Sequence, residues 1–236
     1  MLRVRNEQKK VPFLFMGPSL VMISIVFLYP IISVLIDSFF QISGQKRTFV
    51  GVQNFVDVFT DASFYHSVLI TLLFTVIVTV ISTVLGLLLA VFLNRKFFGK
   101  KIVNSIIILS YVVPAVCLIF TWRYMFNNIY GIMNYVVVDL LKLTDEAPLR
   151  FDQPTFAFIL VSIFAIWKFF PYAYISFNAI LQSMDNSLYE AADIDGASSW
   201  EKFKAITYPA IKPTLVTVVS LRTIWVFYIY TEVYLL

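Results

Sequence analysis

Two cationic side chains fall near the middle of long apolar runs. Lys168 lies within the run 155–181 and Arg222 within the run 214–234. A charge at the centre of a membrane span costs roughly 2.5–3.5 kcal/mol on insertion scales, so each side chain should face protein or water. Both could line a path for a polar solute, and two cations at depth also admit an acidic one. A structural ion pair, or snorkelling to an interface, is the alternative for each.

Aromatic side chains accompany these cations on the same runs. On an ideal helix Lys168 shares a face with Tyr172, and Arg222 shares one with Trp225. Aromatic faces stack on the C–H surfaces of sugars, and tyrosine hydroxyls can hydrogen-bond to sugar hydroxyls. Because aromatic residues make up 17% of the chain, core packing is the alternative for any single one. The predicted solute pathway consists of Lys168, Tyr172, Arg222, Trp225 and Tyr228.

A polar segment, 187–209, separates the fourth and fifth apolar runs. Ser187 and Glu190 have the spacing of a capping box, as do Ser198 and Glu201. In this motif the serine side chain accepts from the glutamate amide, and the glutamate reaches back to the serine amide. Two short helices are therefore expected within the segment. An ordinary helix cap is the alternative role for Glu190.

A turn should lie between these two helices. Gly196 suits the left-handed position that ends a helix, and Pro209 is expected to stop the second helix. The segment therefore predicts a rigid knob of helix, glycine corner and helix. Such a design favours a docking element over a spacer.

The groupings typical of enzymes do not occur. Gly99 and Lys100 are preceded by Asn94 where a phosphate-binding loop needs glycine, and neither a His-Glu-x-x-His nor a Gly-x-Ser-x-Gly motif appears. His66 is the only histidine, which excludes a histidine-rich metal site. The single cysteine, Cys117, is expected to be buried in the third helix and cannot form an internal disulfide. We expect a chain that is not an enzyme and has no cofactor of its own.

The elements that must position these residues are membrane helices. Hydrophobic residues make up 60% of the chain and charged residues 14%, against about a quarter charged in soluble domains. A run of about 20 apolar residues crosses the hydrocarbon core as a helix. The prediction is an all-α, polytopic transmembrane helix bundle. Its five spans are expected at 13–35, 67–93, 102–122, 155–181 and 214–234.

Lysine and arginine placement predicts the orientation. One set of loops holds eleven basic residues and the alternate set holds four. The N-terminus and the segment 187–209 are therefore expected in the cytoplasm. The net charge of +4 is a topology signal and does not indicate nucleic acid. The larger set is Arg3, Arg5, Lys9, Lys10, Arg95, Lys96, Lys100, Lys101, Lys202, Lys204 and Lys212, and the smaller set is Lys46, Arg47, Lys142 and Arg150.

One motif in the polar segment resembles a known family. Glu190-Ala191-Ala192, with Gly196 four residues after Ala192 and Ile206-x-x-Pro209 later, is similar to the EAA loop of permease subunits of bacterial ABC importers. The longer stretch 181–198 is similar to the carbohydrate-uptake branch. The resemblance covers nearly the whole chain. Weaker matches are Asn54-Phe55, Asn94-Arg95-Lys96, Trp167-Lys168 and Leu221-Arg222-Thr223-Ile224-Trp225.

The resemblance implies a type I ABC importer permease, with 1–236 as a single permease domain and 187–209 as its coupling-helix loop. It implies that Glu190 contacts an ATPase electrostatically, that small alanines pack against it and that Gly196 sets the corner. A sixth helix is expected beyond residue 236, because the chain stops while still apolar. The implied docking residues are Glu190, Ala191, Ala192, Asp193, Gly196 and Ala197.

The resemblance also implies partners and a location. These are ATP-binding subunits that hold ATP and Mg²⁺, a second homologous permease that forms a heterodimer, and an external solute-binding protein, in the inner membrane of a bacterium. The expected function is import of a mono- or oligosaccharide, acidic saccharides included. Import of a phosphorylated polyol or an amino acid is an alternative, and an ATP-independent channel or a membrane-embedded enzyme is disfavoured.

Overall fold

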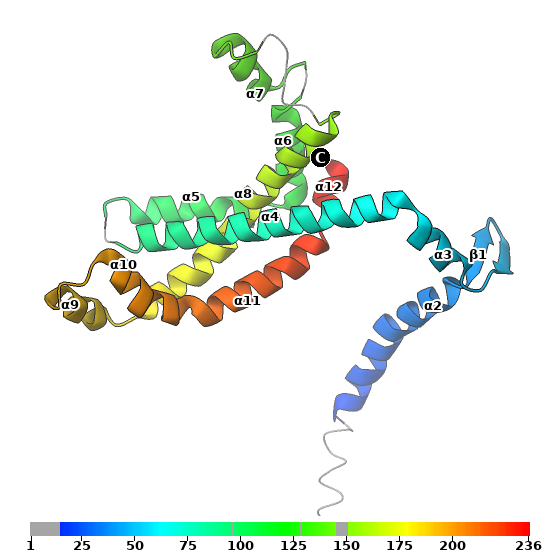
Figure 1. The fold of residues 1–236 in the computed structure, drawn as a ribbon, viewed down its shortest axis with the longest axis horizontal. Coiled ribbons are helices and arrows are strands. Elements are labelled where there is room, and N and C mark those ends of the chain that lie inside the picture. Colours follow the sequence, from blue (N-terminus) through cyan, green and yellow to red (C-terminus); the bar gives the residue numbers. More distant parts are fainter. Residues whose placement is uncertain (1–14, 96, 128, 145–150) are drawn as a thin grey trace, which may run out of the picture. The chain divides into compact units, whose positions relative to one another are not determined.

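Figure 1 shows a computed structural model of the chain, which describes residues 15–95, 97–127, 129–144 and 151–236. The chain divides into two compact units, Met1–Val68 and Leu69–Leu236, which are described separately. The prediction of a single permease domain stays a prediction. Six of the basic positions used for the orientation lie outside the described residues, namely Arg3, Arg5, Lys9, Lys10, Lys96 and Arg150.

The first unit holds one membrane-length helix and a small hairpin. The helical stretch Phe15–Asp37 is long and apolar enough to span a membrane and contains η1 (Ser24–Leu28) and α2 (Tyr29–Asp37). Strands β1 (Phe40–Ser43) and β2 (Lys46–Phe49) pair antiparallel, and α3 (Gln53–Thr60) follows. The Asn54 side-chain amide donates to the backbone oxygens of Ser38 and Phe40 at 2.9 and 3.1 Å, which ties α3 to the hairpin.

The second unit is a helix bundle. It begins within α4 (Ala62–Leu93), and Figure 1 shows α9 and α10 at one end of it and α12 beside α6 and α8. We call these ends the α9 end and the α12 end. The helices after α4 are α5 (Lys100–Val112), α6 (Ala115–Met125), α7 (Ile132–Tyr135), η2 (Val136–Leu140), α8 (Pro154–Ser183), α9 (Asn186–Ile194), α10 (Ser199–Lys202), η3 (Phe203–Thr207), α11 (Tyr208–Phe227) and α12 (Thr231–Leu235).

Helices α4 and α8 approach closely at Gly86. A Cβ atom at Gly86 would lie 2.6 Å from the Ala173 Cβ and 2.8 Å from the Phe170 carbonyl oxygen. Small residues at such a contact let helix backbones meet inside a membrane. The Tyr174 hydroxyl, one residue further on, donates to the Asn104 side-chain oxygen at 2.6 Å and so joins α8 to α5.

The third span predicted at 102–122 is not one continuous helix. Helices α5 and α6 meet at an angle of 96°. Val113 is extended (ψ 135°) and Pro114 follows at ψ 134°, because proline disfavours the helical conformation in the residue before it. Helix α5 has 13 residues and is about 20 Å long, short of the roughly 30 Å of a hydrocarbon core. The described residues therefore contain four continuous membrane-length helices and one bent pair.

Two further predictions near the fifth run are wrong. Pro209 does not stop a helix, since it lies in the first turn of α11 and the π-helical turn directly before it accommodates the missing amide. The π-helical turn η3 precedes it, and Ser199–Phe227 forms one membrane-length stretch. The fifth span accordingly runs earlier than 214–234, and the chain breaks after Phe227 before α12 begins.

Cys117 also differs from expectation. It is exposed on α6, not buried. The bend at Pro114 leaves α6 to bury only Leu118 and Ile119. A sulfur atom at position 117 therefore lies on the outer side of this helix.

Candidate functional site

The first candidate site is the pair of short helices at the α9 end. Helix α9 begins two residues earlier than the sequence predicts, because the Asp185 carboxylate accepts the Ser187 amide at 2.9 Å. The predicted capping box of Ser187 and Glu190 is therefore wrong, and Ser187 lies inside the first turn. The hydrogen bonds from Ser187 lower the pKa of Asp185 below its usual value of 3.8. Aspartate is among the strongest N-cap residues, which explains why it wins this position.

The corner between α9 and α10 confirms two predictions. Gly196 has φ +75°. Its amide donates to the backbone carbonyl oxygen of Asp193 at 3.1 Å, and the Ala197 amide donates to the backbone carbonyl oxygen of Ala192 at 2.9 Å. This is the hydrogen-bond pattern of a Schellman C-cap. The second capping box is also present, since Ser198 and Glu201 satisfy each other's backbone amides at 3.3 and 2.7 Å.

The predicted docking residues form a largely open surface. Glu190, Ala191, Asp193 and Gly196 are exposed, while Ala192 and Ala197 are partly buried. Three large apolar side chains lie exposed on the same two helices, and these are Leu188, Ile194 and Trp200. Exposed apolar residues beside an acidic helix are typical of a protein-binding surface. The docking role of these residues stays a prediction.

The second candidate site is centred on Arg222, whose exposed fraction is 0%. One guanidinium nitrogen, Nη2, donates to the Phe169 carbonyl oxygen at 2.5 Å. The guanidinium carbon lies 4.5, 4.8 and 5.5 Å from the ring centroids of Phe169, Tyr172 and Trp225. Nε and Nη1 have no hydrogen-bond partner among the described residues. Three aromatic faces therefore hold this cation by cation–π interactions.

The aromatic rings around Arg222 form one connected group. Tyr172 and Trp225 meet edge to face with centroids 5.2 Å apart, and Tyr111 on α5 lies 6.3 Å from Tyr172. Tyr111 and Trp225 are each 42% exposed. We call Tyr111, Tyr172, Trp225 and Arg222 the aromatic–arginine cluster. It offers a half-exposed aromatic surface with a buried cation against it.

Lys168 lies outside this cluster. Its ammonium group forms an ion pair with Glu232 on α12, and the two side chains are only 13% and 10% exposed. The sequence prediction missed Glu232, although it is the one acidic residue in the run 214–234 and an acidic residue at that depth requires a partner. Tyr228 is 80% exposed, and no ring contact found in the described residues joins it to the cluster. Of the five predicted pathway residues, the structure thus brings together Tyr172, Arg222 and Trp225.

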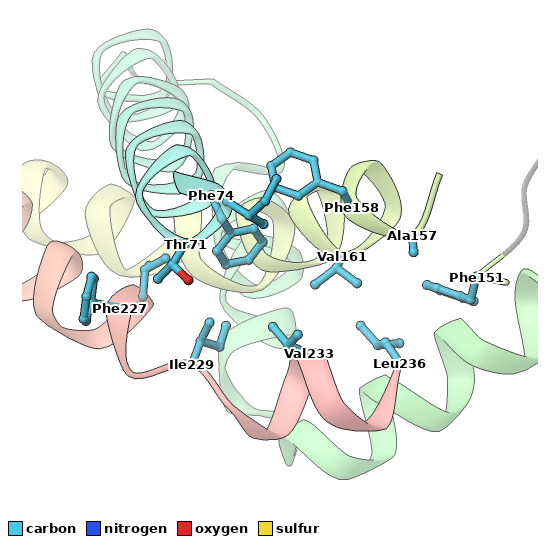
Figure 2. A pocket seen from close by; sticks show the side chains of 12 residues that line it. Thr71, Phe74, Phe151, Ala157, Phe158, Val161, Phe227, Ile229, Val233 and Leu236 are labelled. Atoms are coloured by element: carbon cyan, nitrogen blue, oxygen red, sulfur yellow. The ribbon is translucent and has the colours of Figure 1, made fainter. Parts of the chain in front are cut away.

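A cavity of about 360 Å³ lies at the α12 end, between α4, α8 and the segment that follows α11. Figure 2 shows its lining, in which Phe74, Phe158, Val161 and Ile229 surround the space and Thr71 supplies the one labelled side-chain oxygen. None of the predicted pathway residues lines it. Such an apolar lining does not suit a polar solute. Among the described residues, no group of three histidine, cysteine or acidic side chains could hold a metal.

Residues 82–236 match the family described as the binding-protein-dependent transport system inner membrane component. The chain belongs to this family. It is therefore a polytopic membrane permease, a transport subunit and not an enzyme, as the sequence predicts. The prediction of an ABC importer permease is confirmed.

Relatives of known name agree with this membership. The permease is 49% identical over 241 residues to the inner membrane ABC transporter permease protein YcjO of Escherichia coli, covering 100% of this chain and 82% of that protein. It is 30% identical over 242 residues to the trehalose/maltose transport system permease protein MalF of Thermococcus litoralis, covering 99% and 79%. The crystal structure of a bacterial ABC transporter involved in the import of the acidic polysaccharide alginate matches with a TM-score of 0.80 at 21% identity, covering 97% of this chain and 78% of that chain. This last likeness concerns the fold alone.

Proposed function

We propose that this permease imports a saccharide, and that the solute stacks on the aromatic–arginine cluster. The main support for this proposal is the half-exposed group of Tyr111, Tyr172 and Trp225, which is held in place by the buried guanidinium of Arg222. Flat aromatic faces with nearby hydroxyls suit the C–H faces and hydroxyls of a sugar. Several relatives are named as permeases of transport systems for trehalose/maltose, maltodextrin or arabinooligosaccharides, and these names support the same class of solute.

The charges in the structure favour an uncharged saccharide over an acidic one. Of the two cations at depth, Lys168 is neutralised by Glu232 and Arg222 has no exposed surface. An anionic solute needs an accessible cation, and neither of these offers one. This argument also counts against a phosphorylated polyol, although one relative is an sn-glycerol-3-phosphate transport permease.

The energy source is proposed to be an ATPase pair, one member of which is seated on α9. Glu190 and the exposed apolar side chains Leu188 and Ile194 give this helix the mixed charge and apolar character of a docking surface. The ATPase would hold ATP and Mg²⁺. A second, homologous permease and an external binding protein complete the proposed importer, with the N-terminus and α9 in the cytoplasm. One solved structure similar to this fold is described as a transporter in complex with a pentasaccharide-bound periplasmic protein, which supports the last partner.

Affinity purification of the tagged, full-length gene product in mild detergent tests the assembly. We expect an ATPase and a second permease in the purified complex, identified by mass spectrometry. Replacing Glu190 and Ala192 together (Glu190→Lys with Ala192→Trp) should release the ATPase but keep the permease in the membrane. Recovery of this chain alone as a stable homo-oligomer would instead support an ATP-independent channel.

Uptake of labelled saccharides by cells that carry the full transporter tests the solute. Trp225→Ala removes one stacking face, and we expect the KM for uptake to rise about tenfold, which corresponds to ~1.4 kcal/mol. The matched control is Ile224→Ala, the preceding and also exposed residue of α11. Equal effects of both substitutions would argue against stacking of the solute at Trp225.

A further inference from the structure

Two side-chain contacts fasten α9 to the helical stretch that continues into α11. The Tyr189 and Thr207 hydroxyl oxygens lie 2.8 Å apart, and Asp193 forms an ion pair with Lys202. Thr207 is buried, and it ends η3 immediately before α11 begins. We call these two contacts the α9 clasp.

The clasp contacts one face of α9 at two points. Tyr189 and Asp193 are four residues apart, so they lie on the same face of the helix, about one turn from each other. One contact alone would leave α9 free to pivot about it. Two contacts a turn apart fix both the position and the direction of the helix.

The connection from α9 back to α8 is different. Helix α8 ends at Ser183, and the next two residues are extended, with ψ 144° at Met184 and ψ 121° at Asp185. From this joint, the Asp185 carboxylate accepts the Ser187 amide of α9 at 2.9 Å, and the Tyr189 hydroxyl makes a weak 3.7 Å approach to the Met184 sulfur. Extended residues change direction with little loss of hydrogen bonding, so this joint can bend where the clasp cannot.

Open space also separates the clasp from the end of α4. A cavity of about 350 Å³ is lined by Tyr189, Lys202 and Thr207 on one side and by Asn94 and Arg95 on the other. The clasp is therefore not packed solidly against α4.

We propose that the α9 clasp transmits displacement of α9 to α11, with Tyr189, Thr207 and Lys202 as positioning residues for coupling. The proposal rests on the proposed docking of an ATPase at α9. Helix α11 carries Arg222 and Trp225, and the separation of 15 positions from Thr207 to Arg222 corresponds to about 22 Å along a helix. An ATPase can bias the solute site only through contacts that differ between two states of the transporter. The clasp makes α9, η3 and α11 one lever that reaches that site.

The test uses the complete transporter with a spin label on α9 (Asn186→Cys) and another on α11 (Val216→Cys), in a Cys117→Ser background. With an intact clasp, we expect the distance between labels to change by less than about 2 Å when ATP binds, as for helices that move together. With Thr207→Val and Lys202→Gln, ATP should change it by more than about 5 Å, or one helical turn. Neither substituted residue belongs to the predicted ATPase-docking set.

Matched controls remove the same groups from neighbouring positions. Lys204→Gln with Tyr208→Phe deletes a lysine charge and a tyrosine hydroxyl, both from exposed residues outside the clasp, and should behave as the unmutated protein. Tyr189→Phe removes a single oxygen atom and keeps the test valid if the double variant does not fold. Combined with Thr207→Val, it should add nothing to the effect of Thr207→Val alone.

The outcomes separate the two proposals. An unchanged label distance in the clasp variants, with ATPase still present in the purified complex, overturns the clasp alone. Absence of an ATPase from the unmutated complex overturns the proposed function and the clasp with it. A large ATP-dependent distance change confined to the clasp variants supports both.

Discussion

Two ion pairs mark opposite ends of the second unit and have opposite environments. Asp193 and Lys202 at the α9 end are 62% and 20% exposed and lie nine residues apart in sequence. Lys168 and Glu232 at the α12 end are 13% and 10% exposed and lie 64 residues apart. An ammonium group and a carboxylate thus form an ion pair once at a solvent-exposed surface and once inside the helix bundle.

This difference sets what each pair can do. Exposed ion pairs contribute about 0–1 kcal/mol, since water already solvates both charges. Breaking a buried pair typically costs about 3–5 kcal/mol, because it leaves a desolvated charge without a partner. The pair at the α9 end can therefore be removed by mutation without loss of the fold, which suits it to a test of coupling. The pair at the α12 end holds α12 to α8.

The largest expected effect is that of Lys168→Met. It leaves Glu232 buried without its partner, so we expect a loss of about 3–5 kcal/mol of stability. The measurement is the melting midpoint of the solubilised complex by fluorescence-detected gel filtration. Lys202→Met at the other end is the matched control and should shift the midpoint little.

A second variant distinguishes a structural pair from a solute-binding lysine. Lys168→Met with Glu232→Met removes both charges and should restore most of the stability. Saccharide uptake should recover with it. Uptake that stays lost in a stable double variant would show that Lys168 acts on the solute, as the sequence predicts.

Gly86→Val should have the next largest effect, again away from the α9 end. The added carbon atoms would meet Ala173 and the Phe170 carbonyl at the α4–α8 contact. Overpacking of this kind costs about 1–3 kcal/mol. Gly17→Val is the control, because no atom lies within 4 Å of a Cβ at that helical glycine. Equal melting midpoints for the two variants would show that α4 and α8 separate easily.

The sequence predicts the α9 end better than the α12 end for a physical reason. The Schellman corner at Gly196 and the capping box of Ser198 and Glu201 are made by residues within five positions of one another. Such local motifs can be recognised from the sequence alone. Two local predictions are wrong: the cap at Ser187, because Asp185 competes for the same helix terminus, and the stop at Pro209, because the helical stretch continues through it.

Contacts at the α12 end depend on the folded bundle. The sequence predicts that Lys168 and Arg222 need protein or water around them, and the structure agrees. It does not reveal that Glu232 lies against Lys168, or that Tyr111 joins the rings around Arg222. The bend at Pro114 is signalled by the proline itself, which disfavours a continuous helix, whereas apolar composition alone predicts only a run long enough to span.

Gly196→Val tests the coupling role of the corner at the α9 end. Its φ of +75° disfavours any residue with a Cβ by roughly 1–2 kcal/mol, although no atom lies within 4 Å. We expect a permease that remains in the membrane and transports less solute per ATP hydrolysed. Gly51→Val, with φ +59° in the first unit, carries the same backbone strain and should keep normal coupling. Gly196→Asn should be milder, because asparagine tolerates this conformation. Normal transport per ATP in Gly196→Val would contradict a coupling role for the corner.

The smallest expected effect concerns acid and the N-terminus of α9. Because hydrogen bonds from Ser187 lower the pKa of Asp185, the ionised carboxylate stabilises α9 at any pH above the usual value of 3.8. That stabilisation is lost as the pH falls through the lower pKa of the folded state. Amide hydrogen exchange of the peptide 184–194, corrected for the intrinsic pH dependence, should therefore show reduced protection below about pH 4.

Asp185→Asn keeps a capping oxygen without the titration and should remove the pH dependence, whereas Asp185→Ala should reduce protection at every pH. Equal acid sensitivity of α9 in the wild type and Asp185→Asn would show that another group anchors this helix.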